Sequence, residues 1–296
     1  MTAIVPSPYD EMSRRLALGL ELIDAALGGR VARPVSVAFD GVPLPRSQGS
    51  YSAFGFDITD TLPRVDRHNS CLHALVYRKG LYVADKRTSV ELRFSCPARR
   101  HVPRRLRFPL VDPSLPEPPT PDPDQATLDA MRAARWRKVA LFPGAAYDTG
   151  GAPTGLRGRV RRLVGVDQVP LRWARVEARQ RLRGGAIGPV IGRAHGDDRG
   201  EFLLILGAVP GSMLASLTIN LEVAVFGRAG EPEATDIARK HDPLWDLPME
   251  AAILPPPADD VSLGLKIPDG YAQVAMQVVT FKLGNILSSE VKPFTF

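Results

Sequence analysis

A proline-rich segment near the middle of the chain constrains its fold more than any other feature. Residues 112–124, DPSLPEPPTPDPD, contain six prolines. Each proline fixes φ and removes a backbone N–H donor, so neither a helix nor the interior of a sheet tolerates this density. The segment predicts a semi-rigid, polyproline-type spacer. It divides the chain of 296 residues into two parts that are each long enough to form a domain.

Short alternating runs predict that the part before the spacer is a β-sandwich. Apolar residues alternate from Leu16 to Leu22, and the alternation resumes after the Gly28-Gly29 turn. A period of two is typical of strands with one buried face, although the Leu and Ala content of the first run also allows a helix. Further strand-like runs follow at 50–58, 71–84, 89–96 and 104–110. About seven short strands are typical of an immunoglobulin-like sandwich, which we expect over residues 1–111.

The segment that follows predicts a short helix and a second set of strands. Asp124 is a favourable N-cap for a helix over residues 125–138, in which acidic Asp129 comes early and the basic residues come late. We assign residues 112–137 to the spacer and this helix. Strand-like runs then occupy residues 139–142, 155–164, 170–179, 199–207 and 216–227. They predict a second β-sandwich over residues 138–230.

The C-terminal segment, residues 231–296, leaves two arrangements open. Residues 228–260 are rich in Pro, Glu and Asp and predict little regular structure. Strand-like runs follow at 261–268, 272–284 and 291–296. These runs either complete the second sheet or form an arm that pairs with the sheet edge of a neighbouring subunit.

One stretch of the second part resembles a known domain family. The motif GRV (158–160) is followed by PLRWARVEA (170–178), by GRA (192–194) and by DDRGEFLL (197–204). This arrangement resembles the carboxypeptidase regulatory-like, or transthyretin-like, domain, which combines a G-x-V strand, a P-L-x-x-A-x-V-x-A strand and a D-x-G-x-F-x-L hairpin. The chain departs from that pattern at His195, where the family has Thr. The resemblance implies a β-sandwich and says little about function.

The hairpin motif also makes physical sense without the resemblance. Asp197 and Asp198 favour a tight turn because Asp bonds to nearby backbone N–H groups, and Gly200 accepts a positive φ. Beyond the turn, Phe202, Leu204 and Leu206 are expected to point into the core.

The order of the parts resembles a second group of proteins. An immunoglobulin-like part, a proline-rich spacer, a carboxypeptidase regulatory-like part and an extended β-structured C-terminus are also the layout of accessory proteins of phage-tail-like contractile injection systems. The resemblance implies a structural or adaptor subunit in the baseplate or cap. It also implies that the partners are other protein subunits, in a homo- or hetero-oligomer.

No recognisable catalytic motif occurs in the sequence. The five histidines form neither H-x-x-x-H nor H-E-x-x-H, and there is no G-x-S-x-G elbow and no phosphate-binding glycine loop. His68 and His73 lie near Asp66 and Cys71, and we interpret them as loop residues beside a thiol rather than as metal ligands. We therefore predict no catalytic residue and no cofactor.

Two acidic pairs, Asp197-Asp198 and Asp259-Asp260, are candidates for calcium binding. Each pair lacks the several further oxygen ligands that calcium requires. We interpret both as ordinary solvated turns and predict no metal site.

Arginine-rich strands predict contacts with an acidic partner. Nine arginines lie within residues 157–183, and Trp136 and Trp173 lie near basic clusters, as in proteins that bind single-stranded nucleic acid. However, 32 acidic residues nearly balance the 38 basic ones, and the net charge is only +6. This balance favours a basic patch that meets an acidic protein subunit over nucleic-acid binding. The expected interaction residues are Arg104, Arg105, Arg107, Arg159, Arg161, Arg175 and Arg179.

Cysteine content and hydropathy bear on the compartment. There are two cysteines, Cys71 and Cys96, no apolar signal-peptide core at the N-terminus, and no run of about 18 apolar residues. We expect a protein of the cytoplasm, or of a particle assembled there, with no signal peptide, no membrane span and two reduced thiols. A disulfide between the two cysteines remains the alternative.

Taken together, these features predict an all-β, non-catalytic structural or adaptor subunit of a large assembly, with a contractile injection apparatus as the leading hypothesis. Three alternatives stay open. An adhesion or carbohydrate- or protein-binding β-sandwich module would be favoured by an oxidised Cys71–Cys96 pair. A basic nucleic-acid-binding protein would show binding that depends steeply on salt. An enzyme would need a pocket that joins His68, His73 and a carboxylate.

Overall fold

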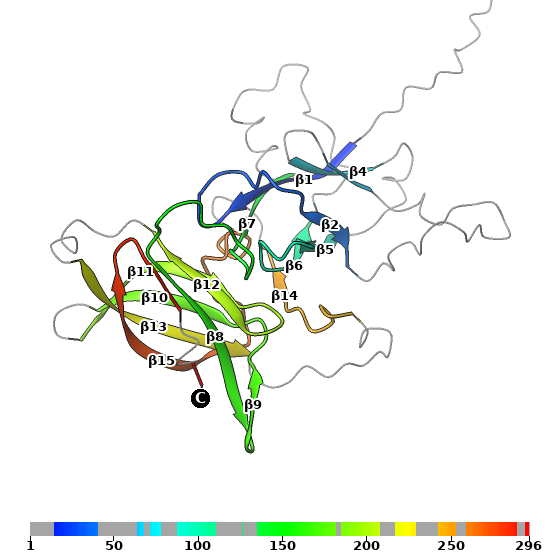
Figure 1. Ribbon diagram of the computed structural model, residues 1–296. Coiled ribbons are helices and arrows are strands. Elements are labelled where there is room, and N and C mark those ends of the chain that lie inside the picture. Colours follow the sequence, from blue (N-terminus) through cyan, green and yellow to red (C-terminus); the bar gives the residue numbers. More distant parts are fainter. Residues whose placement is uncertain are drawn as a thin grey trace, which may run out of the picture.

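The elements of secondary structure in the described part of the chain are all strands (Figure 1). The computed structural model describes residues 15–40, 64–67, 72–77, 88–110, 126, 135–181, 185–207, 217–228, 242–252, 259–288 and 294–295. The prediction of a β-rich fold is therefore confirmed. The predicted strand at 50–58, residues 71 and 78–84 of the predicted run at 71–84, and the proline-rich spacer lie outside the described residues.

Two four-stranded sheets share the first hydrophobic core. One sheet has the order β3-β4-β1-β7 and consists of β1 (Arg15–Asp24), β3 (Arg64–Arg67), β4 (Leu72–Tyr77) and β7 (Trp136–Leu141). The other has the order β14-β6-β5-β2 and consists of β2 (Ser36–Phe39), β5 (Ser89–Ser95), β6 (Arg104–Pro109) and β14 (Met249–Ala251).

The strand predictions for this core are confirmed, including the choice of strand over helix for the first run. Leu18 and Leu20 of β1 are buried, as are alternate residues of β5 and β6. Leu16 is 40% exposed because a bulge between Leu16 and Leu18 shifts it out of the buried row. In β4 the most buried residues are His73 and Leu75, on the face opposite to the predicted apolar row.

Segments from beyond the spacer complete this first core. β7 pairs in parallel with β1, and β14 pairs in parallel with β6. Val139, Leu141, Ala252 and Val261 are all members of the core cluster built by strands of the N-terminal part. Trp136, Arg137 and Lys138 belong to β7, so the prediction of a helix is wrong for these residues: their pairing with β1 extends the strand. Ala126 and Arg135 are helical, and residues 125 and 127–134 of the predicted helix lie outside the described part.

A nine-stranded sheet curls around the second hydrophobic core like half a barrel (Figure 1). Its main path runs β15-β13-β10-β11-β12-β8-β16, and β9 and β17 also pair with β8. The strands are β8 (Gly155–Val164), β9 (Asp167–Pro170), β10 (Arg175–Arg181), β11 (Ile187–His195), β12 (Glu201–Leu206), β13 (Thr218–Arg228), β15 (Tyr271–Lys282), β16 (Ile286–Ser288) and β17 (Phe294–Thr295).

The C-terminal strands pair within the chain. β15 is antiparallel to β13 over eleven residue pairs, and β16 and β17 run parallel to β8. Of the two arrangements that the sequence leaves open, the structure shows the one in which these strands complete the second sheet.

The predicted strand at 261–268 is wrong: the segment forms turns, in which the backbone N–H of Leu263 donates to the carbonyl of Asp259 and Gly264 has a φ of 65°.

The predicted tight turn between β11 and β12 is confirmed. The Asp197 carboxylate accepts hydrogen bonds from the backbone N–H groups of Arg199 and Glu201, at 2.8 and 3.0 Å. Gly200 has a φ of 71°, and a Cβ there would collide with the carbonyl oxygen of Val160. Phe202, Leu204 and Leu206 are buried in the second core, as predicted.

Replacing Gly200 with Ala tests this turn, and Gly165→Ala is its matched control. Gly165 also has a positive φ, of 62°, but open space surrounds its Cβ position. We expect Gly165→Ala to lower the free energy of unfolding by about 1 kcal/mol, the cost of the backbone conformation alone. Gly200→Ala also forces the turn away from β8 and should cost at least about 3 kcal/mol. Urea denaturation measures both, and equal losses would contradict the role of the close contact.

Candidate functional site at the junction of three sheets

Arg104 is a fully buried cation at the point where the three sheets meet. It is the first residue of β6, and its side chain lies on the same buried face as Leu106 and Phe108. Its Nη1 donates to the carbonyls of Ala140 in β7, at 2.8 Å, and of Ser262, at 2.6 Å. Its Nη2 donates to the carbonyl of Val261, also at 2.6 Å. Arg104 thus binds one sheet of the first core while belonging to the other.

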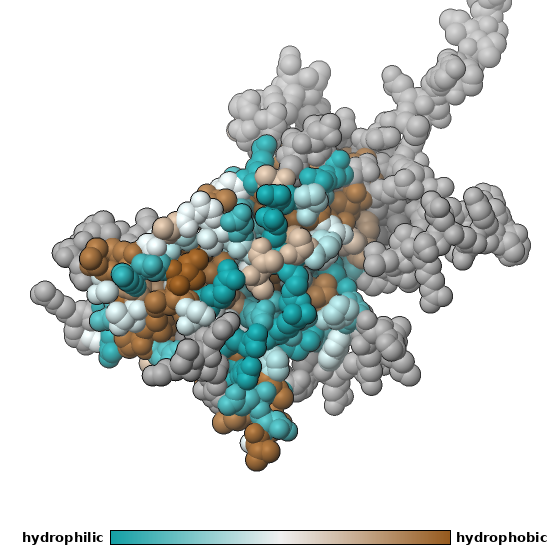
Figure 2. All heavy atoms as spheres, viewed as in Figure 1, coloured by the Kyte–Doolittle hydropathy of each residue, from teal (hydrophilic) through white to brown (hydrophobic). Residues whose placement is uncertain are grey.

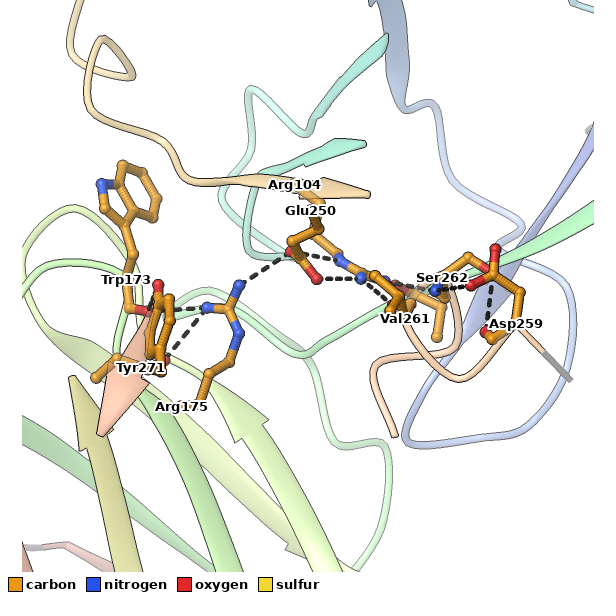
Figure 3. A network of polar contacts seen from close by, with 10 residues as sticks. Arg104, Trp173, Arg175, Glu250, Asp259, Val261, Ser262 and Tyr271 are labelled. Carbon is orange, nitrogen blue, oxygen red and sulfur yellow. Dashed lines mark hydrogen bonds and ion pairs between the residues drawn. The ribbon is translucent and has the colours of Figure 1, made fainter. Parts of the chain in front are cut away.

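Glu250 connects Arg104 to the nine-stranded sheet (Figure 3). It lies in β14 and is buried. Its Oε2 accepts from Arg104 Nη2 at 2.6 Å, and its Oε1 accepts both from Arg104 Nε at 3.2 Å and from Arg175 Nη2 at 3.0 Å. Arg175 is the first residue of β10 and is buried as well. One carboxylate therefore bridges two guanidinium groups that come from different sheets.

Backbone carbonyls compensate the second positive charge of this network. Arg175 Nη1 donates to the carbonyl of Trp173 at 2.9 Å, and the Tyr271 hydroxyl donates to the same oxygen at 2.9 Å. Trp173 has a φ of 61°, an uncommon conformation for a residue other than glycine. The Arg175 guanidinium also lies 5.4 Å from the centre of the Tyr271 ring. The network carries two cations and one anion, so these dipoles and the ring share the stabilisation of the remaining charge.

Burial alone would raise the pKa of Glu250, but the charges and hydrogen bonds of Arg104 and Arg175 outweigh it and lower the pKa. The carboxylate therefore stays ionised inside the protein. A buried ion pair stabilises a fold only when its polar atoms are satisfied, and all five N–H donors of Arg104 have acceptors here.

Glu250 is the last of three acidic residues, four positions apart, that attach one segment to both cores. We call residues 242–252 the acidic strap. Asp242 pairs with Arg93 of β5, and Asp246 pairs with Arg172, just before β10, at 2.5 Å. Glu250 joins Arg104 and Arg175. The strap thus contacts the first core, then the second, then both, and its strand β14 is the edge strand next to β6 in Figure 1.

His195 lies beside the network and is held neutral. Its ring stacks on Phe142, with 3.8 Å between the ring centroids and 16° between the planes. Burial is the main cause that lowers its pKa well below 6.5, and the positive charges of Arg175 and Arg104 act in the same direction. The position at which the chain departs from the transthyretin-like pattern is therefore a buried contact between the two cores.

A second polar cluster anchors the end of β1. The Asp24 carboxylate accepts from the Tyr147 hydroxyl at 2.9 Å and lies 3.2 Å from His101 Nε2. Burial acts to raise the pKa of Asp24, but these contacts and the N–H groups of Ala26 and Leu27 outweigh it and lower the pKa. All three side chains are buried, so the cluster fixes the turn after β1 against the loop between β5 and β6 and against the segment that follows β7.

A pocket of about 270 Å³ lies between the two cores, next to this cluster. Arg99 lines it and pairs with Asp197 and Asp198 of the acidic turn. Its other lining residues include Cys96, His101 and Leu244. Cys96 is a free, buried thiol, while Cys71 lies outside the described residues.

Two of the seven predicted interaction arginines, Arg104 and Arg175, are interior residues and cannot meet a partner at the surface. Arg105 pairs with Asp40 and Glu91, and Arg107 pairs with Glu91. The remaining three lie on the nine-stranded sheet. Arg159 pairs with Glu201, Arg161 bonds to Gln168, and Arg179 pairs with Glu177. Each of the seven has an acceptor within the chain.

Among the residues that the structure describes, no group of His, Cys, Asp or Glu has the arrangement of a metal site. His73, His101 and His195 are buried in separate places, and His68 and His241 lie outside these residues. Asp197 and Asp259 both bond to backbone N–H groups of their own turns. Within the same described ranges, no helix has the length and apolar character needed to cross a membrane.

Comparisons with protein-family models, with curated proteins and with solved structures found no match to this chain. The account of its function therefore rests on the geometry of the junction.

The network predicts a large difference between two Glu→Gln substitutions. Glu250→Gln leaves two buried guanidinium groups without a counter-charge and should lower the free energy of unfolding by about 3–5 kcal/mol. Glu201→Gln is the matched control, because its partner Arg159 has a side chain that is 47% exposed. That change should cost at most about 1 kcal/mol. Chemical denaturation measures both, and a Glu250→Gln loss no larger than that of the control would show that the network contributes little.

His195 predicts a pH dependence with a defined sign. Below pH 6.5 the unfolded chain takes up a proton at this histidine, whereas the folded chain, with its lowered pKa, does not. The free energy of unfolding should therefore fall as the pH drops from about 7 to about 5.5. In His195→Gln this fall should be shallower, with the remainder due in part to His73, whose pKa burial also lowers. Identical slopes for the two proteins would contradict a neutral, buried His195.

Proposed function

We propose that the protein is a non-catalytic structural or adaptor subunit of a large assembly. The observation that supports it best is the Arg104–Glu250–Arg175 network, which joins all three sheets through buried, fully ionised contacts. A buried ion network is costly to break and resists rotation of one sheet against another. Such a joint suits a subunit that transmits force or holds neighbours at a fixed distance.

The proposed architecture is an immunoglobulin-like sandwich and a transthyretin-like sandwich, with the acidic strap between them. The order of these parts supports placement in the baseplate or cap of a phage-tail-like contractile injection apparatus. The exposed arginines Arg107 and Arg159 remain candidates for contacts with acidic neighbours, since their internal partners are themselves partly exposed to solvent. Such pairs exchange partners at little cost.

This proposal is tested in cells that produce the protein. Contractile particles would be isolated and analysed by quantitative mass spectrometry, with and without deletion of the coding sequence. We expect the chain at a fixed ratio to the sheath subunits, and particles that are absent or lack a baseplate or cap feature by electron microscopy after deletion. Particles that lack the chain and are complete after its deletion would overturn the proposed function.

A further inference from the structure

The outer edge of β15 is a long strand edge without a partner among the described residues. β15 ends the main path of the nine-stranded sheet and pairs with β13 alone. Seven of its twelve residues are exposed. Figure 2 shows apolar residues gathered over the part of the sheet where β13 and β15 lie. Met276 and Val278 of β15 are 54% and 53% exposed.

From Ala275 to Phe281 this edge lacks the features that usually prevent strands from pairing. Natural edge strands are protected by charged residues, by proline, by β-bulges or by shortness. The sequence YAQVAMQVVTFK of β15 has no proline and no acidic residue, and its only charge is Lys282 at the last position. Its one irregularity is a bulge at Val274, which leaves Ala275–Lys282 regular. Within the part of the chain that the structure describes, β15 is therefore free to accept another strand along most of its length.

We infer that this edge pairs with the same edge of a second copy of the chain, so that two nine-stranded sheets join in an antiparallel, two-fold symmetric dimer. The charge distribution favours a second copy. Each chain carries a net charge of +6, yet Tyr271–Phe281 has no charged residue, and antiparallel pairing separates the two Lys282 side chains to opposite ends of the interface. Pairing along this strand brings the two molecules together without opposing like charges.

Geometry selects the register. Paired residues in an antiparallel ladder point to the same face, so the two-fold axis must lie at a residue that faces its own copy. With the axis at Gln277, the regular stretch Ala275–Val279 pairs with itself. Each Met276 then lies beside Val278 of the other copy, which buries both exposed apolar side chains of each strand. The inference deepens the proposed function, and rests on it, by naming one partner of the subunit.

Disulfide cross-linking of the full chain tests this register. In Gln277→Cys the two new thiols face each other across the axis. In the matched control, Gln273→Cys, they lie eight residues apart along the strands, or about 27 Å, too far for a disulfide. We expect Gln277→Cys to form a covalent dimer at least about tenfold faster than Gln273→Cys. The unchanged chain, with Cys71 and Cys96, serves as the blank. Equal rates would overturn the inference.

Sedimentation of the protein without added cysteines gives an independent readout. The unchanged chain should be a dimer, and Val278→Lys, which places a charge beside Met276 of the other copy, should be a folded monomer. Leu163→Lys, at an exposed position of β8, should remain a dimer. An unchanged chain that stays monomeric would overturn the inference. This holds also if a strand of another protein is then found to pair with the β15 edge. A monomeric chain found in isolated particles would overturn the dimer alone, and a dimeric chain absent from particles would overturn the proposed function alone.

Discussion

The guanidinium group of Arg104 is the constraint on which the arrangement of the three sheets depends. An N–H group of a buried cation that has no acceptor is costly, and the acceptors of Arg104 come from β7, from the turn at Val261 and Ser262, and from Glu250. These are three separate parts of the chain. Moving one sheet would leave a charged donor without a partner, which costs several kcal/mol in a low-dielectric interior.

Glu250 extends this constraint to the nine-stranded sheet, because the same carboxylate also binds Arg175. The acidic strap contains two further ion pairs between a carboxylate and an arginine, Asp242 with Arg93 and Asp246 with Arg172, and their arginines are more exposed than Arg104 and Arg175. Ion pairs and the stacked rings of Phe142 and His195 thus both join the two cores at this junction. Stacking of this kind adds about 0.5–1.5 kcal/mol beyond area burial.

How well the sequence predicts a feature of this structure depends on how far apart along the chain the interacting residues lie. Strands with alternating apolar residues are predicted well, since the signal is local: β5, β6, β8 and β13 all occur where the pattern places them. Arg104 lies two residues before Leu106 and on the same face, although its charge led us to expect it at an interface with another protein. Its partner does not follow from the sequence, because Glu250 is 146 residues away in a segment whose Pro, Glu and Asp content predicts little structure.

The same reasoning explains the predictions that failed. Trp136, Arg137 and Lys138 have the composition of a helix end, but pairing with β1, which is distant in sequence, makes them a strand. Arg104 and Arg175 were expected at an interface with another protein, and the acidic residues that bind them lie in the same chain instead. The charge of an arginine does not indicate whether its acidic partner lies in the same chain or in another protein, since the electrostatic attraction is the same for both.

The most direct test of this account is hydrogen exchange, followed peptide by peptide, across a denaturant series. Peptides from β5 report on the first core, and peptides from β13 report on the second. If the Arg104–Glu250–Arg175 network joins the cores into one cooperative unit, both sets lose protection at a single midpoint in the unchanged chain and at two separate midpoints in Glu250→Gln. Two separate midpoints in the unchanged chain would contradict the central claim.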